Sequence, residues 1–444
     1  MRGGTLTLGA VALVCLTTTA IGAGRARWGG TLRFTLPAVE GFDPMRAESD
    51  EAVQLAVMVH QPLYALEGRA SRPVLLRSSA PDGADLACTL ADEARFHDGR
   101  PVTSEDVRWS LGRLSTAPAA SPARVLASLL RVEVVDSARF VLRLKAPIPR
   151  STLERLLALP QAAILPLGGD GHTGAGPFAL QGGGDRAAIL LPHLAHPDGR
   201  PFVDRVEVRW ADHPAEAAER LFYGEADLSL RGGGRLASLP DVRRVDGPTI
   251  ELVALWPSDP RRTAVPGALT GPGVVASLLS RLEREAVGAE GLLPGLGGSG
   301  PAPTPLGAVV IGLGPGGGEL ADVAAALRDV AIRSGGAGSR VGTAADVTLW
   351  LGIRRLSAPD PLAVALQALG AAGDEAAARD LVVRVTHDDD GAARRALGAL
   401  VADGAVGPLL HLRRSVWVRG GLRDVRFDGH GALDLASAWW EGGR

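Results

Sequence analysis

The chain has very little cysteine for its length of 444 residues. Its two cysteines are Cys15 and Cys88, and Cys15 lies in an apolar N-terminal run. If that run is removed during export, Cys88 is left alone and cannot form an internal disulfide. The sequence therefore predicts a fold that is stabilised by its core and not by covalent cross-links.

Lysine and excess charge are also scarce. Lys145 is the single lysine, so mechanisms that depend on a lysine Schiff base are disfavoured. The formal net charge is −2, which gives no electrostatic attraction to nucleic acid or to anionic lipid. We therefore expect no nucleic-acid partner.

Common catalytic patterns are missing as well. The sequence has no G-x-S-x-G, no H-E-x-x-H and no P-loop. Its serine, histidine and aspartate residues do not form a pattern typical of a catalytic triad. We therefore predict that the protein is not an enzyme and requires no cofactor or metal.

Residues 1–26 have the features of a secretory signal peptide. An apolar run at 6–16 is followed by small residues suited to cleavage. Cys15 follows Val14, which is bulky where a lipid-attachment motif has a small residue, so a lipid anchor is not expected. The predicted location is periplasmic or extracellular.

The rest of the chain alternates between strand and helix patterns, as in an α/β protein of two or three lobes. From residue 308 a strand–helix–strand–helix order predicts a partly parallel sheet. The segment 242–307 is the least regular and predicts one helix, at 273–285. The other main predictions are strands at 30–36 and 205–210, a hairpin of 131–135 with 138–144, and helices at 49–59, 319–334, 360–371 and 392–402.

Three short patterns could indicate ligand sites, but each has a simpler explanation. Glycines 312, 314 and 317 match G-x-G-x-x-G, yet Pro315 removes a phosphate-binding N–H, so a strand-to-helix turn is favoured. His193, His196 and Asp198 have metal-like spacing, but a surface loop is favoured. The run 387–390, His-Asp-Asp-Asp, is favoured as a solvated loop.

The stretch FHDGRPVTSEDVRWSLGRL, which begins at Phe96, combines several local signals. Residues 98–99, Asp-Gly, predict a tight turn in which glycine takes a positive φ. Thr103 or Ser104 can N-cap the helix that follows, with Asp106 in its first turn. Apolar residues at i, i+4 and i+7 then predict one buried stripe.

This stretch resembles the signature of the family 5 extracellular solute-binding proteins, the peptide- and nickel-binding proteins of ABC importers. Other landmarks follow in that family's order, among them GGTLRFTLPAVEGFDP near the start, TGAGPFAL at 173–180 and GEADL at 224–228. The resemblance extends over about 30–440 and is strongest before residue 230. The signature positions that match are Phe96, His97, Asp98, Gly99, Pro101, Thr103, Asp106, Val107, Ser110 and Arg113.

The resemblance implies a two-lobed, periplasmic-binding-protein-like α/β clamp with an extra subdomain and mixed sheets flanked by helices. It divides the chain after the signal peptide into three parts. These are a first lobe of 29–62, 172–250 and 411–444, an extra subdomain of 63–171, and a second lobe of 251–410. Ligand would bind between the lobes, which close about a hinge.

The resemblance also implies which residues shape the cleft. From the second lobe these are Trp350 and Asp360, and from the loop near the hinge Gly174, Gly176 and Phe178. The two glycines serve either close approach of the backbone to a ligand or only the shape of a turn.

The second lobe departs from the family pattern. Peptide-binding members carry Trp-x-x-Asp, whose carboxylate pairs with the peptide's amino terminus, but three residues after Trp350 this chain has Ile353. Because a buried ammonium without a carboxylate is costly, we expect no unmodified peptide in the usual mode.

The implied function is capture of a small solute, peptide-like or otherwise, by an exported and monomeric protein for an ABC importer permease. The alternative is a divergent protein of the same fold that acts as a sensor or interaction partner without transport.

Overall fold

The computed structural model describes residues 26–441 with internal gaps. The residues outside the description are 1–25, 38, 40, 48, 68–69, 119–120, 185, 214, 231, 233, 260–262, 282–288, 291–306, 314–320, 343–345, 357–361, 363–364, 367–368, 371–372, 386–390 and 442–444. The predicted signal peptide, Gly314, Gly317, Asp360 and the run 387–390 lie among them.

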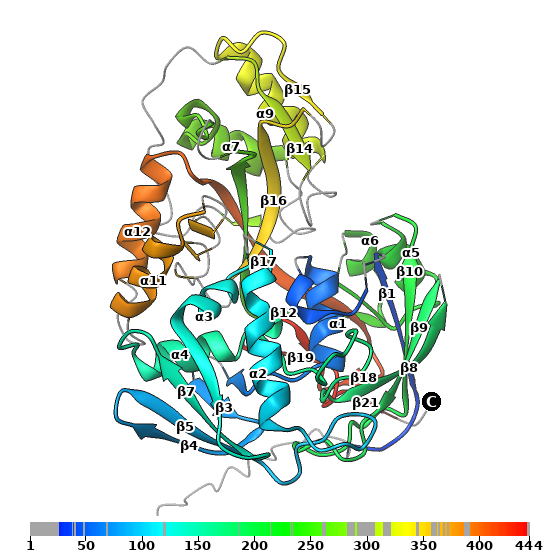
Figure 1. The fold of residues 1–444 in the computed structure, drawn as a ribbon. Helices are drawn as coiled ribbons and strands as arrows, with labels where there is room; N and C mark the ends of the chain where they lie inside the picture. Colours follow the sequence, from blue (N-terminus) through cyan, green and yellow to red (C-terminus); the bar gives the residue numbers. More distant parts are fainter. Residues whose placement is uncertain are drawn as a thin grey trace, which may run out of the picture.

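One mixed sheet runs through both lobes of the molecule (Figure 1). Two long antiparallel strands, β12 (Val242–Pro257) and β17 (Gly407–Arg419), pass from one lobe to the other and pair along most of their length. Within the described residues the strand order is β15-β14-β16-β12-β17-β11-β1-β10-β9-β8, with β13 (Ala289–Glu290) beside β17. The fold is thus the predicted two-lobed α/β clamp.

The first lobe is built on β1 (Thr31–Pro37), where alternate side chains are buried. β1 pairs in parallel with β10 (Arg205–Ala211) and β11 (Leu228–Ser229). Helix α1 (Asp50–Val59) lies within the predicted helix 49–59, and Ser49 is its N-cap, because the Ser49 hydroxyl accepts the N–H of Ala52. The remaining elements of this lobe are β8 (Phe178–Gly184), β9 (Ala187–Pro192), η1 (Pro44–Arg46), α5 (Glu216–Phe222), α6 (Gly234–Ala237), β18 (Leu422–Arg423), β19 (Arg426–Phe427), β20 (Leu433–Asp434) and β21 (Trp439–Trp440).

The second lobe continues the sheet with β14 (Val310–Leu313), which lies parallel to β16 (Leu349–Leu356), as the strand–helix order predicted. Helices α7 (Pro272–Arg281) and α9 (Ala321–Arg333) share a core with these strands. The expectation that 242–307 is irregular was wrong for its first part, because residues 242–257 form β12. The other elements are η4 (Gly267–Leu269), β15 (Arg340–Val341), α11 (Glu375–Arg384) and α12 (Gly391–Ala402).

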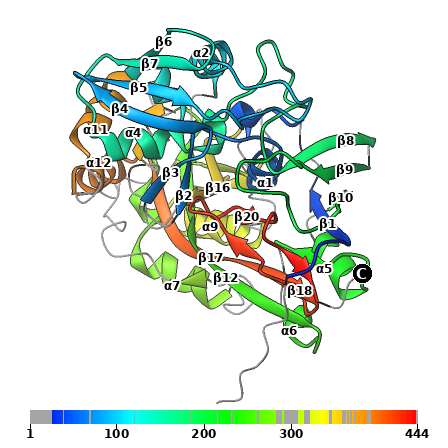
Figure 2. The same ribbon diagram turned by 90° about the horizontal axis from the view of Figure 1, so that it is seen from below.

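The extra subdomain is a four-stranded antiparallel sheet in the order β4-β5-β7-β6, with helices packed against it (Figures 1 and 2). Its apolar core also includes side chains of α11 and α12, such as Leu381 and Leu397. The subdomain is therefore packed against both lobes. Its elements are β2 (Tyr64–Glu67), β3 (Ala70–Pro73), β4 (Leu76–Asp82), β5 (Asp85–Leu90), α2 (Ser104–Arg113), η2 (Leu114–Thr116), α3 (Arg124–Leu129), β6 (Leu130–Val134), β7 (Arg139–Leu144), α4 (Arg150–Leu157) and η3 (Pro160–Ala162).

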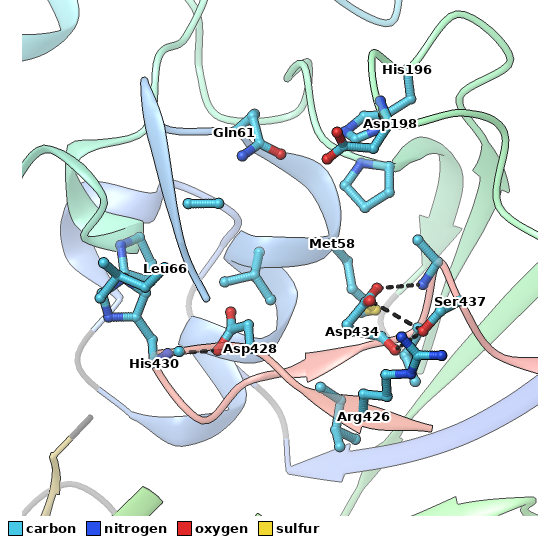
Figure 3. A pocket seen from close by; sticks show the side chains of 18 of the residues that line it. Met58, Gln61, Leu66, His196, Asp198, Arg426, Asp428, His430, Asp434 and Ser437 are labelled. Atoms are coloured by element: carbon cyan, nitrogen blue, oxygen red, sulfur yellow. Dashed lines mark hydrogen bonds between the residues drawn. The ribbon is translucent and has the colours of Figure 1, made fainter. Parts of the chain in front are cut away.

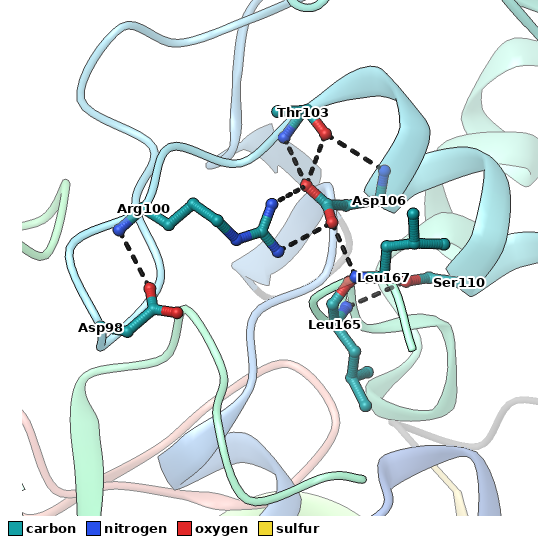
Figure 4. Close-up of polar contacts among 7 residues, drawn as sticks. All are labelled: Asp98, Arg100, Thr103, Asp106, Ser110, Leu165 and Leu167. Atoms are coloured by element: carbon teal, nitrogen blue, oxygen red, sulfur yellow. Dashed lines mark hydrogen bonds and ion pairs between the residues drawn. The ribbon is translucent and has the colours of Figure 1, made fainter. Parts of the chain in front are cut away.

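Hydrogen bonds connect the turn before α2 with the start of this helix (Figure 4). Gly99 has a φ of +85°, and Asp98 accepts the N–H of Arg100, as the sequence predicted. Thr103 is the N-cap, and Asp106 completes a capping box. The Asp106 carboxylate also accepts from the Arg100 guanidinium at 3.0 Å and from the backbone N–H of Leu167 at 2.8 Å.

Candidate functional site

The carboxyl ends of parallel strands in both lobes point toward the middle of the sheet. In the first lobe, β11 lies antiparallel to β17, so its end at Ser229 and the end of β1 at Pro37 face the second lobe. In the second lobe, Leu356 at the end of β16 pairs with Ile250 of β12, so this end faces the first lobe. Open α/β sheets bind ligands beyond such carboxyl ends.

The long strand β12 is continuous, but its ladder with β17 is irregular between these two sets of strand ends. Its pairing with β17 shifts register between Asp246 and Ile250. The sequence there contains Gly247 and Pro248, and proline has no N–H to donate to the ladder. The β12–β17 ladder between the lobes therefore lacks regular pairing at residues 247–249 of β12.

The loop that contains Gly174 and Gly176 packs against the end of α1. A Cβ at Gly174 would lie 2.0 Å from the carbonyl oxygen of Val59, and one at Gly176 would lie 2.6 Å from the carbonyl carbon of Val59. Phe178 is fully buried in the first-lobe core beside Met58. The glycines thus allow close approach of this loop to α1.

His97 of the opening motif holds this loop in place. Its Nδ1 accepts the N–H of Gly174, so its Nε2 carries the proton and donates to the carbonyl oxygen of Gly176 at 3.0 Å. The backbone N–H of His97 in turn donates to the carbonyl oxygen of Gly174. The motif and the loop are therefore one structural unit, although about 80 residues separate them in the chain.

The second-lobe candidate Trp350 lies on β16, opposite Trp256 of β12. A Cβ at Gly312 would lie 2.8 Å from the Trp350 ring, so Gly312 makes room for this indole. Trp350 is partly buried against the core cluster that contains Ala254 and Trp256. Ile353 stands opposite Val253 in the ladder, and Asp360 lies outside the described residues.

A pocket of about 590 Å³ lies between the first lobe and the extra subdomain (Figure 3). Its walls come from the end of α1, the β2–β3 hairpin, the loop 196–202 and the C-terminal segment 426–437. None of its described lining residues falls between 251 and 410, so it is separate from the carboxyl ends of the second lobe. Phe178 is the one sequence-predicted site residue that borders it.

Sequence reasoning did not predict this pocket. The only signal was the spacing of His196 and Asp198, which both line the pocket, whereas His193 does not. The Asp198 carboxylate pairs with Arg72 at 2.9 Å, and the N–H of Asp198 donates to Nδ1 of His196. Within the described part of the chain no group of three or more His, Cys, Asp or Glu side chains could hold a metal ion.

Buried histidines surround the joint between the subdomain and the first lobe. Burial lowers the pKa of His60, His97 and His196 to about 4 in each case. The rings of His97 and His193 meet edge to face, with centroids 5.0 Å apart. These side chains are therefore neutral at pH 7 and act in packing and hydrogen bonding.

The residues that the structure describes include no helix long and apolar enough to cross a membrane.

Comparison with known proteins finds a family to which part of the chain is similar. The profile of the bacterial extracellular solute-binding proteins, family 5 Middle, matches residues 70–249, which include the opening motif. A Brucella ovis protein named as an ABC transporter peptide-binding protein is 30% identical over 165 residues. That match covers 34% of this chain and only 31% of the Brucella protein.

Solved structures extend the likeness to nearly the whole chain. The dipeptide-binding protein from Pseudoalteromonas sp. SM9913 has a TM-score of 0.76 at 12% identity, covering 93% of this chain and 100% of that one. The oligopeptide-binding protein AppA from Bacillus subtilis has a TM-score of 0.74 at 15% identity, covering 94% and 100%. These identities establish the fold. Residues 70–249 of the chain, which include the opening motif, are similar to the family 5 bacterial extracellular solute-binding proteins.

Proposed function

We propose that this protein is exported, captures a small solute between its two lobes and delivers it to the permease of an ABC importer. The observation that carries the proposal is that carboxyl ends of parallel strands from both lobes face each other across the register shift between β12 and β17. Residues 29–62, 172–250 and 411–444 would form one jaw and 251–410 the other. Closure about 246–250 would bury the solute.

The solute need not carry a free ammonium group. In the proposed cleft, position 353 of β16 holds isoleucine and not an acid. An ammonium buried there would lack a charged partner and would cost several kcal/mol. We therefore propose a solute whose recognition does not depend on a peptide amino terminus.

Of the five candidate site residues, Trp350 and Asp360 are the ones that we propose to act on the solute. Gly174, Gly176 and Phe178 would act indirectly, because their contacts are with α1 and the first-lobe core. Asp360→Asn should weaken solute binding at an unchanged melting temperature. A matched change at the exposed Asp346→Asn should alter neither quantity.

The decisive experiment is native mass spectrometry of the purified protein to identify a co-purifying solute. Small-angle X-ray scattering with and without that solute should then show a smaller radius of gyration in the bound state. Thermal-shift assays of free and N-acetylated peptides should show no preference for the free amino terminus. An unchanged radius of gyration on binding would contradict capture by lobe closure.

A second candidate function is sensing or protein interaction without transport, and the missing acid at position 353 favours it. If permease and ATPase genes do not adjoin this gene, and the protein does not support solute uptake in cells, the second function is preferred. In both cases we propose a monomeric binding protein without catalytic activity.

A further inference from the structure

The pocket between the first lobe and the extra subdomain has a size that suits a small molecule. Its volume of about 590 Å³ falls in the range of ligand sites. Buried apolar side chains form much of its wall, among them Met58, Leu66 and Leu433. A bound molecule would therefore need an apolar body.

The arginines that line this pocket are already paired with carboxylates. Arg72 contacts both Glu67 and Asp198, at 2.7 and 2.9 Å. Arg200 pairs with Asp204 and Arg426 with Asp424, which both lie outside the lining. These guanidinium groups therefore offer little uncompensated positive charge to a ligand.

Two carboxylates of the lining have only neutral donors. Asp428 accepts the backbone N–H groups of His430 and Ala432. Asp434 accepts the N–H of Ala436 at 3.0 Å and the hydroxyl of Ser437 at 3.1 Å. Within the described part of the chain neither carboxylate makes an ion pair. In Figure 3, Asp428 lies beside His430, and Asp434 lies beside Ser437 and Arg426.

The surroundings of Asp434 disfavour its charged form. Burial raises the pKa of this carboxyl, and the like charge of Asp428 adds to the effect, while the hydrogen bonds offset it only in part. A cation beside Asp434 would compensate for the lost solvation of its charged form.

A hydrogen-bond donor without a partner borders the same pocket. Nδ1 of His196 accepts the N–H of Asp198, so the ring proton lies on Nε2. The residue is 7% exposed, and Nε2 has no partner among the described residues. In Figure 3, His196 and Asp434 lie on different sides of Met58. A ligand acceptor could therefore pair with His196 while a cationic group reaches Asp434.

We propose that this pocket binds a small organic cation, a protonated amine on an apolar body that also carries a hydroxyl or carbonyl oxygen. The ammonium group lies against Asp434, the body lies on Met58 and Leu66, and the oxygen accepts from His196. This site is distinct from the proposed solute cleft, because none of its described lining belongs to the second lobe.

Isothermal titration calorimetry of the whole protein with tyramine tests the proposal. Tyrosol, in which a hydroxyl replaces the ammonium, is the matched neutral probe. We expect tyramine to bind at least about tenfold more tightly than tyrosol, the scale of a charge-assisted hydrogen bond. Equal binding of the two probes, or no binding of tyramine at millimolar concentration, would overturn the proposal.

Variants locate the binding. Asp434→Asn should weaken tyramine about tenfold and leave tyrosol unchanged. Ala436→Phe, which places a ring in the pocket and keeps both aspartates, should abolish binding of both probes. Glu105→Gln removes one charge from the exposed face of α2 and is the matched control.

Circular dichroism checks that each variant folds. If Asp434→Asn does not fold, the binding data for Ala436→Phe test the proposal. Persistence of tyramine binding in folded Ala436→Phe protein contradicts the proposed site. A solute identified for the lobe cleft should bind this variant normally, so failure of the pocket proposal is distinguishable from failure of the proposed function.

Discussion

Asp106 at the start of α2 and Asp434 at the C-terminal wall of the pocket are both desolvated aspartates, but their environments differ. Burial by itself would raise the pKa of Asp106, yet hydrogen bonds from Arg100, Thr103 and Leu167 more than offset it and hold the pKa below its usual value. The pKa of Asp434 is raised, because its neutral donors offset burial only in part.

The opposite pKa shifts of the two carboxyl groups indicate that Asp106 has a structural role. Asp106 has a guanidinium, a hydroxyl and two backbone N–H groups as partners, so nothing remains for a ligand to provide. Asp434 lies beside a cavity and has no cationic partner among the residues that the structure describes. A saturated carboxylate fixes the fold, whereas an undersaturated one at a cavity is suited to binding.

Of the changes that we consider, lowering the pH should reduce the free energy of unfolding the most. Three histidines have a pKa of about 4 in the folded protein and about 6.5 in the unfolded chain: His60, His97 and His196. Unfolding therefore takes up protons between pH 6.5 and pH 4. The free energy of unfolding should therefore fall as the pH falls, by on the order of 5 kcal/mol from pH 6.5 to pH 5. Urea titrations at several pH values measure this.

The two aspartates then act in opposite directions. The contribution of Asp106 to stability is lost as the pH falls below about 3.8, whereas protonation of Asp434 at its raised pKa favours the folded state.

His97→Gln should reduce the change in the free energy of unfolding between pH 6.5 and pH 5 by about a third, because it removes one of the three buried histidines. A flat profile across that range would contradict the assignment of neutral buried histidines.

Asp106→Ala should be the most damaging single substitution that we consider. It removes the carboxylate of the capping box and leaves the N–H of Leu167 without its acceptor, so it should lower the free energy of unfolding by about 2–4 kcal/mol. Urea unfolding at pH 7 measures the change. Glu105→Gln, at the neighbouring exposed position, should cost less than about 0.5 kcal/mol. If Asp106→Ala lowers the free energy of unfolding by no more than Glu105→Gln does, then Asp106 is not the structural carboxylate that we describe.

Gly174→Ala separates the two explanations of the glycine loop. Its Cβ would meet the backbone oxygen of Val59 and force the loop away from α1, which should cost about 2–3 kcal/mol. Gly182→Ala is the control, because a Cβ there meets open space. If Gly174→Ala melts like the wild type but loses solute binding, then the loop contacts solute and our assignment is wrong.

Asp98→Ala should have the smallest effect. It removes the acceptor of the Arg100 N–H in an exposed turn and should cost about 1 kcal/mol, with no change in solute affinity. Thermal unfolding and calorimetry measure the two quantities. Loss of solute binding at a wild-type melting temperature would show that this turn reaches the ligand.

Local structure followed from local residues in much of the chain. The turn at Asp98 and Gly99, the cap at Thr103 and the start of α1 at Ser49 depend on neighbours within a few positions, so each was predictable. β12 was not predicted, because Gly247 and Pro248 are typical of a loop. Pairing with β17 on one side and β16 on the other overrides that preference.

The sequence by itself determined the α/β fold and the resemblance to family 5 solute-binding proteins, because the motif from Phe96 to Leu114 encodes a turn, a cap and a helix whose signals are all local. Only the tertiary structure decided what His97 holds, where Trp350 packs, and that Asp434 meets His196 across a pocket. Those contacts join residues that lie far apart in the chain, and long-range packing determines their burial and charge balance.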